Sequence, residues 1–142
     1  MRRAPALAGL SRDHHRELVQ ARRLLRAAGA SPAARLAAAR EYVEAFFAET
    51  VEHFRREEEI VFPAYARHAG STQVLERILR EHMQLHGLVR TLRAEVAAGD
   101  VSPATARALG ELLREHVRVE ERVLFEDVQR AVPAAELAEL PL

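Results

Sequence analysis

The chain has 142 residues, enough for one domain with a single core, and its 21 basic and 21 acidic residues give a formal net charge of zero. It contains no cysteine, which excludes disulfides, iron–sulfur clusters and thiolate zinc sites, so a bound metal would need histidine and carboxylate ligands. The balanced charge favours neither nucleic acid nor a membrane as partner, and the strong helix formers Ala, Leu, Arg and Glu dominate the composition.

Start and stop signals predict two long helices in the first half of the chain. The first covers residues 7 to about 28 and ends at a glycine. The second begins with Ser31 as its cap and Pro32 in its first turn, a favoured arrangement at a helix start. It extends to about residue 61, where we expect Pro63 to kink or end it, with a last turn that reaches Tyr65 or His68 before the stop at Gly70.

Two more helices are predicted in the second half. The third starts near Ser71 or Thr72 and ends at Gly99, and the fourth repeats the cap-plus-proline start at residues 102–103 and ends before Pro133. Residues 134–142 have room for about one further turn. Short connections favour antiparallel neighbours, so we expect an all-α, up-down-up-down antiparallel four-helix bundle. We expect residues 1–142 to form one domain, with a core at about 7–130.

Two segments of the chain are near copies, and each pairs a histidine with a glutamate. HFRREEEIVFP at 53–63 contains His53 and Glu57, and HVRVEERVLFE at 116–126 contains His116 and Glu120. A spacing of four puts both side chains on one face of a helix, one turn apart, which is how a helix offers two ligands to one metal. Glu121 stays a second candidate in the later copy, although the symmetry between the copies favours Glu120.

Each copy is preceded by a histidine segment that follows an acidic residue. DHHREL supplies His14 and His15, and EHMQLH supplies His82 and His86. Adjacent histidines cannot both point inward: the apolar stripe of the first helix favours His14, whereas aligning HREL with HMQL favours His15. The remaining histidine, His68, falls outside the repeat beside a helix end, where we expect it on the surface.

Several of these histidines fall on apolar helix faces, where a polar group without a partner costs about 1–3 kcal/mol. One interpretation is that each His–Glu pair only stabilises its own helix, by about 0.2–0.5 kcal/mol. Convergence of several such groups in one bundle instead favours a metal cluster, which neutralises the carboxylates and uses the imidazole lone pairs.

On these motifs, residues 7–130 resemble the hemerythrin-like, or HHE cation-binding, domain family. The resemblance implies a non-heme di-iron centre of two iron ions bridged by two carboxylates, although imidazole and carboxylate ligands also suit zinc or manganese. Three histidines would serve one iron and two the other. The implied metal ligands are His14 (or His15), His53, Glu57, His82, His86, His116 and Glu120.

The implied ligand set is asymmetric, because Leu18 (or Val19), which cannot ligate, stands where the first helix would carry the counterpart of His86. We therefore expect the open coordination position, where a small molecule binds, on the side of the first helix. The function we favour is binding or sensing of O2, NO or iron. The alternatives are a di-iron enzyme of peroxide, nitric-oxide or iron-donation chemistry, and a structural bundle without metal.

The N-terminal apolar run is too short and too quickly charged for a signal sequence, and no segment resembles a membrane span. We accordingly expect a cytoplasmic protein that is a monomer or a weak homodimer.

Overall fold

The computed structural model describes residues 1–142, and the protein is all-helical, as predicted. Helical backbone is continuous over four stretches, residues 8–28, 32–69, 73–98 and 103–131, called the first to fourth stretches below. The elements are η1 (Pro5–Leu7), α1 (Ala8–Ala28), α2 (Pro32–Ala45), η2 (Phe46–Thr50), α3 (Val51–Arg56), η3 (Glu57–Val61), α4 (Phe62–Ala69), α5 (Gln73–Ala98), α6 (Pro103–Val119), η4 (Glu120–Leu124), α7 (Phe125–Ala131) and α8 (Ala134–Ala138).

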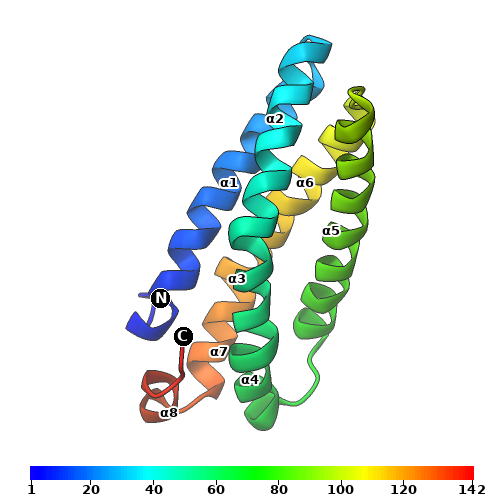
Figure 1. The fold of residues 1–142 in the computed structure, drawn as a ribbon. Helices are drawn as coiled ribbons and strands as arrows, with labels where there is room; N and C mark the ends of the chain where they lie inside the picture. The colour runs from blue at the N-terminus through cyan, green and yellow to red at the C-terminus, as the bar shows by residue number, and fades with distance from the viewer.

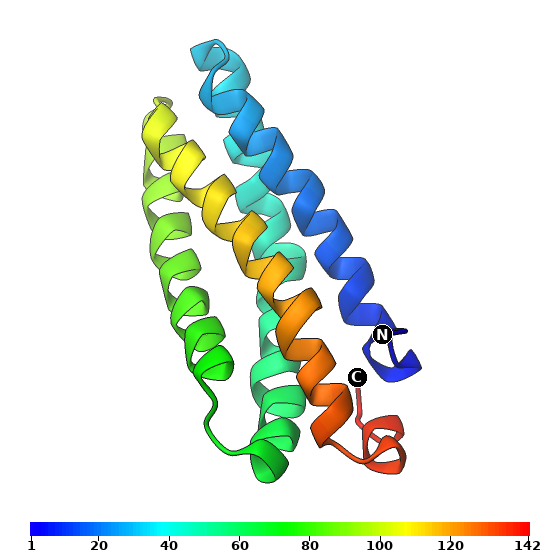
Figure 2. The ribbon, with the colours of Figure 1, turned by 180° about the vertical axis from the view of Figure 1, so that it is seen from behind.

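The four stretches lie side by side, joined by short connections at the two ends of the molecule (Figures 1 and 2). The first packs against the second and fourth, and the third likewise contacts the second and fourth. None of the helices is both long enough and apolar enough to span a lipid bilayer.

The predicted helix starts are confirmed by their caps. The hydroxyl of Ser31 accepts the Ala34 N–H at 3.2 Å, and the hydroxyl of Ser102 accepts the Ala104 N–H at the same distance. Thr72 caps α5 in the same manner. Gly99 ends α5 with a φ of 73°, a left-handed conformation that glycine adopts without steric cost.

Three π-helical segments interrupt the second and fourth stretches, and the sequence did not predict them. Two of them begin at the glutamates of the duplicated motif, η3 at Glu57 and η4 at Glu120. π turns of this kind are often found at functional sites. The second stretch does not end at Pro63, which occupies the first turn of α4 directly after η3, and the helix continues to Ala69.

The interior is divided into two apolar clusters along the bundle. One cluster contains Tyr42, Phe46, Leu85 and Leu113, and the other contains residues nearer the termini and the α4–α5 connection, such as Leu10. On every stretch the two clusters are separated by six to ten residues, and all the buried histidines and glutamates lie in these intervals or within two residues of them. This level of the structure is called the polar band.

Helices α1 and α6 approach closely at Gly110. A Cβ atom there would lie 2.8 Å from Leu25 Cγ and 3.0 Å from the carbonyl oxygen of Ala21. This close approach brings the first and fourth stretches together at the level of the apolar cluster that contains Ala21 and Leu113.

Candidate metal centre

Four histidines and two glutamates meet in the polar band, and each is at most 2% exposed. Every stretch contributes: the first and third one histidine each, the second and fourth one histidine and one glutamate each. The six residues are His14, His53, Glu57, His82, His116 and Glu120. Removing so many titratable groups from water is costly unless they satisfy one another or bind an ion.

The donor atoms form two groups that share a carboxylate. One group contains His14, His53, Glu57 and Glu120, and the other contains His82, His116 and Glu120, with the donor atoms of each group within 4.8 Å of one another. Glu57 also spans both groups: its Oε1 lies 3.0 Å from His53 Nε2, and its Oε2 lies 3.4 Å from His82 Nε2. Both glutamates therefore lie between the histidines of the two groups.

The inner atoms of the cluster lack hydrogen-bond partners, which is the test of whether a metal fits. Both carboxylate oxygens of Glu57 and of Glu120, and the Nε2 atoms of His82 and His116, are buried and make no hydrogen bond. The Nε2 atoms of His14 and His53 lie 3.0 Å apart, facing each other. Lone pairs that converge in this manner fit cations bound between them, because a cation would satisfy all of these atoms together.

Each inward-facing histidine is fixed from behind by a second carboxylate, which contacts its Nδ1 atom. The four contacts are His53 with Asp13 at 3.2 Å, His82 with Glu58 at 2.9 Å, His116 with Glu81 at 2.9 Å and His14 with Glu121 at 2.7 Å. This arrangement keeps a proton on Nδ1 and leaves Nε2 free to bind a metal.

These four contacts form a closed ring around the bundle. Asp13 joins the first stretch to the second, Glu58 the second to the third, Glu81 the third to the fourth, and Glu121 the fourth back to the first. These four outer carboxylates could have been found in the sequence, because each is next to a cluster residue. Asp13 and Glu81 directly precede inward-facing histidines, and Glu58 and Glu121 directly follow inward-facing glutamates.

The neighbouring carboxylates raise the pKa values of three cluster histidines. Burial lowers the pKa of His53, but the charge of Glu57 and the hydrogen bond to Asp13 outweigh burial and raise it to about 10. Burial likewise lowers the pKa of His82, while the neighbouring carboxylates of Glu120 and Glu57 raise it to about 10. For His14, the neighbouring carboxylates of Glu120, Glu121 and Glu57 overcome burial and hold the pKa well above its usual range. With a pKa of about 10, His53 and His82 carry a second proton at neutral pH when no metal is bound, and a bound metal would displace that proton from Nε2.

The pKa values of the two cluster glutamates shift in the opposite direction, downward. Burial raises the pKa of Glu57, but three neighbouring histidines, His53 first and then His14 and His82, hold it well below its usual range. Burial and the charge of Glu57 raise the pKa of Glu120, and the surrounding histidines, His116 first, lower it to about 2. Both carboxylates are therefore ionised, the state in which they ligate metals.

The structure distinguishes between the alternatives that the sequence left open. His14 is buried in the cluster, and the adjacent His15 is exposed. Glu120 faces the cluster, whereas Glu121 is one of the outer carboxylates. His68 lies near the surface, with its Nε2 2.6 Å from Glu136.

His86 is the expected ligand that the structure does not bring to the cluster. It is exposed on α5, with its ring centroid 5.3 Å from that of Phe46 and 5.8 Å from that of Phe54. The reason for expecting an open position beside the first helix therefore falls away. The group beside α1 has four donor residues and the other has three.

A comparison with protein-family models gives one match. The model described as the hemerythrin HHE cation binding domain matches residues 8–128, which include all six inward-facing residues and all four outer carboxylates. No curated protein and no solved structure matches the chain.

Proposed function

Because this chain belongs to the hemerythrin HHE cation-binding family, we propose that its His/Glu cation-binding site holds two iron ions bridged by Glu57 and Glu120. His14 and His53 would serve one ion, and His82 and His116 the other. The observation that carries the proposal is the set of buried inner oxygen and nitrogen atoms without partners, which two cations between the bridging carboxylates would satisfy. Zinc and manganese suit the same donors.

We also propose that the four helical stretches form one domain, an up-down-up-down antiparallel four-helix bundle of hemerythrin type. Two imidazoles and two shared carboxylates per ion leave positions free for a small molecule. We therefore propose that the protein binds or senses O2 or a related molecule such as NO. When bound, iron supplies the electrons that bind such molecules reversibly.

The protein's own side chains would exclude water and fix the ligand geometry. The ring of Phe54 is stacked on that of His82 with centroids 3.9 Å apart, and Phe125 is stacked on His14 with centroids 5.2 Å apart. Both phenylalanines are at most 1% exposed. Apolar rings on the outer sides of the histidines keep bulk water away, so the metal would meet solvent only through defined openings.

The test begins with metal content. Protein expressed in iron-supplemented medium should contain two iron ions per chain, and reconstitution of metal-free protein should give the same ratio. Anaerobic ferrous protein exposed to air should then develop visible charge-transfer bands that disappear when oxygen is removed. A ratio below one after reconstitution would refute the di-metal centre. Bands that convert irreversibly would instead favour an enzyme of peroxide, nitric-oxide or iron-donation chemistry.

A further inference from the structure

Four exposed arginines line one groove between α1 and the fourth stretch. They are Arg22 on α1, Arg114 and Arg118 on α6, and Arg122 on η4. The groove has a volume of about 450 Å³ and follows the contact between the two stretches, blue and yellow to orange in Figure 2. None of the four forms an ion pair or a hydrogen bond with a carboxylate, whereas eight other arginines of the chain do. The groove therefore concentrates positive charge in a chain whose formal net charge is zero.

The carboxylate on the groove wall does not neutralise this charge. Glu121 is the only acidic residue that lines the groove. Its oxygens already contact Arg3, Ser11 and His14, each at 2.7 Å. The four groove arginines are therefore left without an anionic partner from the protein itself.

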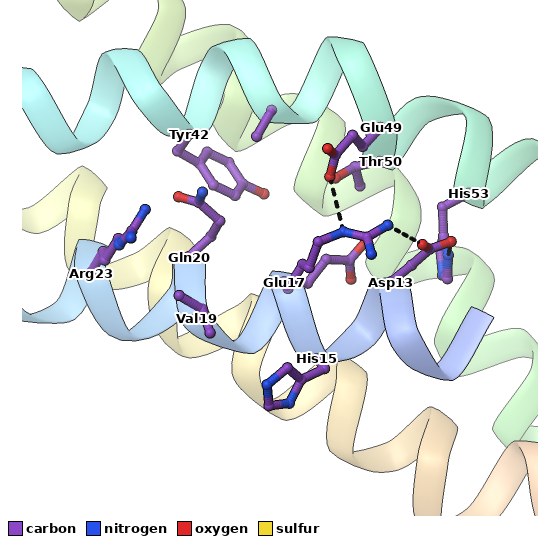
Figure 3. A pocket seen from close by; sticks show the side chains of 12 residues that line it. Asp13, His15, Glu17, Val19, Gln20, Arg23, Tyr42, Glu49, Thr50 and His53 are labelled. Atoms are coloured by element: carbon purple, nitrogen blue, oxygen red, sulfur yellow. Dashed lines mark hydrogen bonds and ion pairs between the residues drawn. The ribbon is translucent and has the colours of Figure 1, made fainter. Parts of the chain in front are cut away.

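A cavity elsewhere on α1 shows the contrasting arrangement. Arg16 lines the cavity between α1 and the second stretch, and its guanidinium pairs with both Asp13 and Glu49, as the dashed lines in Figure 3 show. Water can complete the hydrogen bonds of the groove arginines, but it carries no charge and cannot offset four positive charges held together. A cleft lined by charges of one sign attracts ions of the opposite sign. The groove therefore favours an anion over water alone.

Three of the arginines form a regular row. Arg114, Arg118 and Arg122 are four residues apart, so they follow one another at steps of about 6 Å along the helix axis. Like charges at this spacing repel one another and destabilise the helix, and a bound anion would remove that repulsion. Each guanidinium can hold a phosphate group through two parallel hydrogen bonds. The row therefore favours an anion in which two phosphate groups are linked directly.

The wall between the arginines is apolar. Leu18 and Leu25 of α1 are half-buried in it, and Val117 of α6 is buried. Sites for small molecules usually enclose about 300–1,000 Å³ and combine an apolar wall with a few charged or polar groups. The groove has this composition, so it fits an organic molecule whose apolar part covers the leucines while its phosphates contact the arginines.

We propose that this groove binds a small organic diphosphate, a molecule with two linked phosphate groups on an apolar body. A nucleic acid is disfavoured, because its affinity comes from many phosphate contacts over a broad basic surface. The row of arginines is only about 12 Å long. Glu111 and Glu115, on the exposed face of α6, would also repel a longer polyanion. The inference goes beyond the proposed function and does not depend on the metal centre.

The experiment measures the binding of inorganic pyrophosphate, ADP and geranyl diphosphate to the full chain by calorimetry, at about 0.15 M salt to screen weak surface attraction. Pyrophosphate should bind saturably. ADP or geranyl diphosphate should bind more tightly, and the tighter of the two identifies the apolar body as a ring system or a hydrocarbon chain. Arg118→Gln should weaken binding about tenfold or more, because it removes charged hydrogen bonds to phosphate. Arg80→Gln is the matched control: it removes the same charge from an exposed arginine of α5, outside the groove, and should leave affinity unchanged.

Equal affinities in the Arg118→Gln and Arg80→Gln proteins would overturn the inference, and so would tighter binding of duplex DNA than of pyrophosphate. Binding of both organic diphosphates no tighter than that of pyrophosphate would refute the apolar body. Glutamine is a good helix former, so the variants should fold; if Arg118→Gln does not, Arg114→Gln decides in the same manner. Diphosphates also coordinate metal ions, so binding that needs the metal but not Arg118 would count against the groove. Arg118-dependent binding by protein that takes up no metal would support the groove and refute the proposed function.

Discussion

The Nδ1 atom of His116 lies 2.9 Å from Oε2 of Glu81, and Arg77 holds the other oxygen of that carboxylate at 2.8 Å. The carboxylate is thus fixed from two sides, and it in turn fixes which imidazole nitrogen faces the metal site. Carboxylates in this position both orient a histidine ligand and increase its basicity.

Replacing Glu81 by Ala should therefore lower metal affinity by about 10–100-fold, because the imidazole of His116 loses its orientation. Glu115→Ala is the matched control. Glu115 also approaches Arg77, at 3.5 Å, but it is exposed and contacts no histidine of the cluster. Competition with a chelator of known affinity measures both variants. Equal affinities in the two would show that the outer carboxylate does not support the ligand.

His82→Ala should remove metal from the protein, whereas His86→Ala should retain it. The two histidines are one turn apart on α5, but only His82 lies in the buried cluster. Elemental analysis after reconstitution compares them directly, with the surface variant His68→Ala as a further control. Loss of metal in His86→Ala equal to that in His82→Ala would reinstate His86 as a ligand.

Metal-free protein should be most stable between about pH 4.5 and 6.5. The pKa of His53 and of His82 is about 10 in the fold against 6.5 for the free side chain, so their contribution is complete below pH 6.5 and is lost as pH rises toward 10. The pKa of Glu120 is about 2 against 4.5, so its contribution is complete above pH 4.5 and is lost as pH falls toward 2.

Urea unfolding of metal-free protein across this pH range measures the effect. Metal-loaded protein is the contrast, because metal competes with protons for the same histidines and so gains affinity as pH rises. A free energy of unfolding of the metal-free form that increases between pH 6.5 and 9 would contradict the assigned shifts.

Gly110→Ala should destabilise the protein by about 1–3 kcal/mol, although alanine is the better helix former. The added methyl group would meet Leu25 and the backbone of Ala21, which cannot both move away. Gly87→Ala on α5 is the control: its Cβ would meet no atom within 4 Å, and it should gain up to about 1 kcal/mol. Thermal or urea unfolding compares the two. A stabilised Gly110→Ala protein would show that α1 and α6 can separate without cost.

The helix starts could be predicted because they depend on local chemistry. The hydroxyls of Ser31, Thr72 and Ser102 satisfy N–H groups within three residues, so no tertiary information is needed. The family could be recognised for a similar reason, since the histidine–glutamate spacing is a local feature of two helices.

The position of His86 could not be derived in the same manner. A spacing of four places it on the same face as His82, but it also moves it about 6 Å along the helix axis. That step takes the His86 ring out of the cluster to an exposed position beside Phe46 and Phe54. The π turns at Glu57 and Glu120 were also missed, because an idealised helical wheel assumes 3.6 residues in every turn.

The ring of four histidine–carboxylate contacts has a consequence for how the molecule opens. Because the ring is closed, no stretch can leave the bundle without breaking two of the contacts, whichever stretch moves first. Opening at this level therefore always breaks contacts to two neighbouring stretches at once. Backbone amides beside the ring should exchange their hydrogens more slowly than those near the connecting loops, which exchange through local fraying.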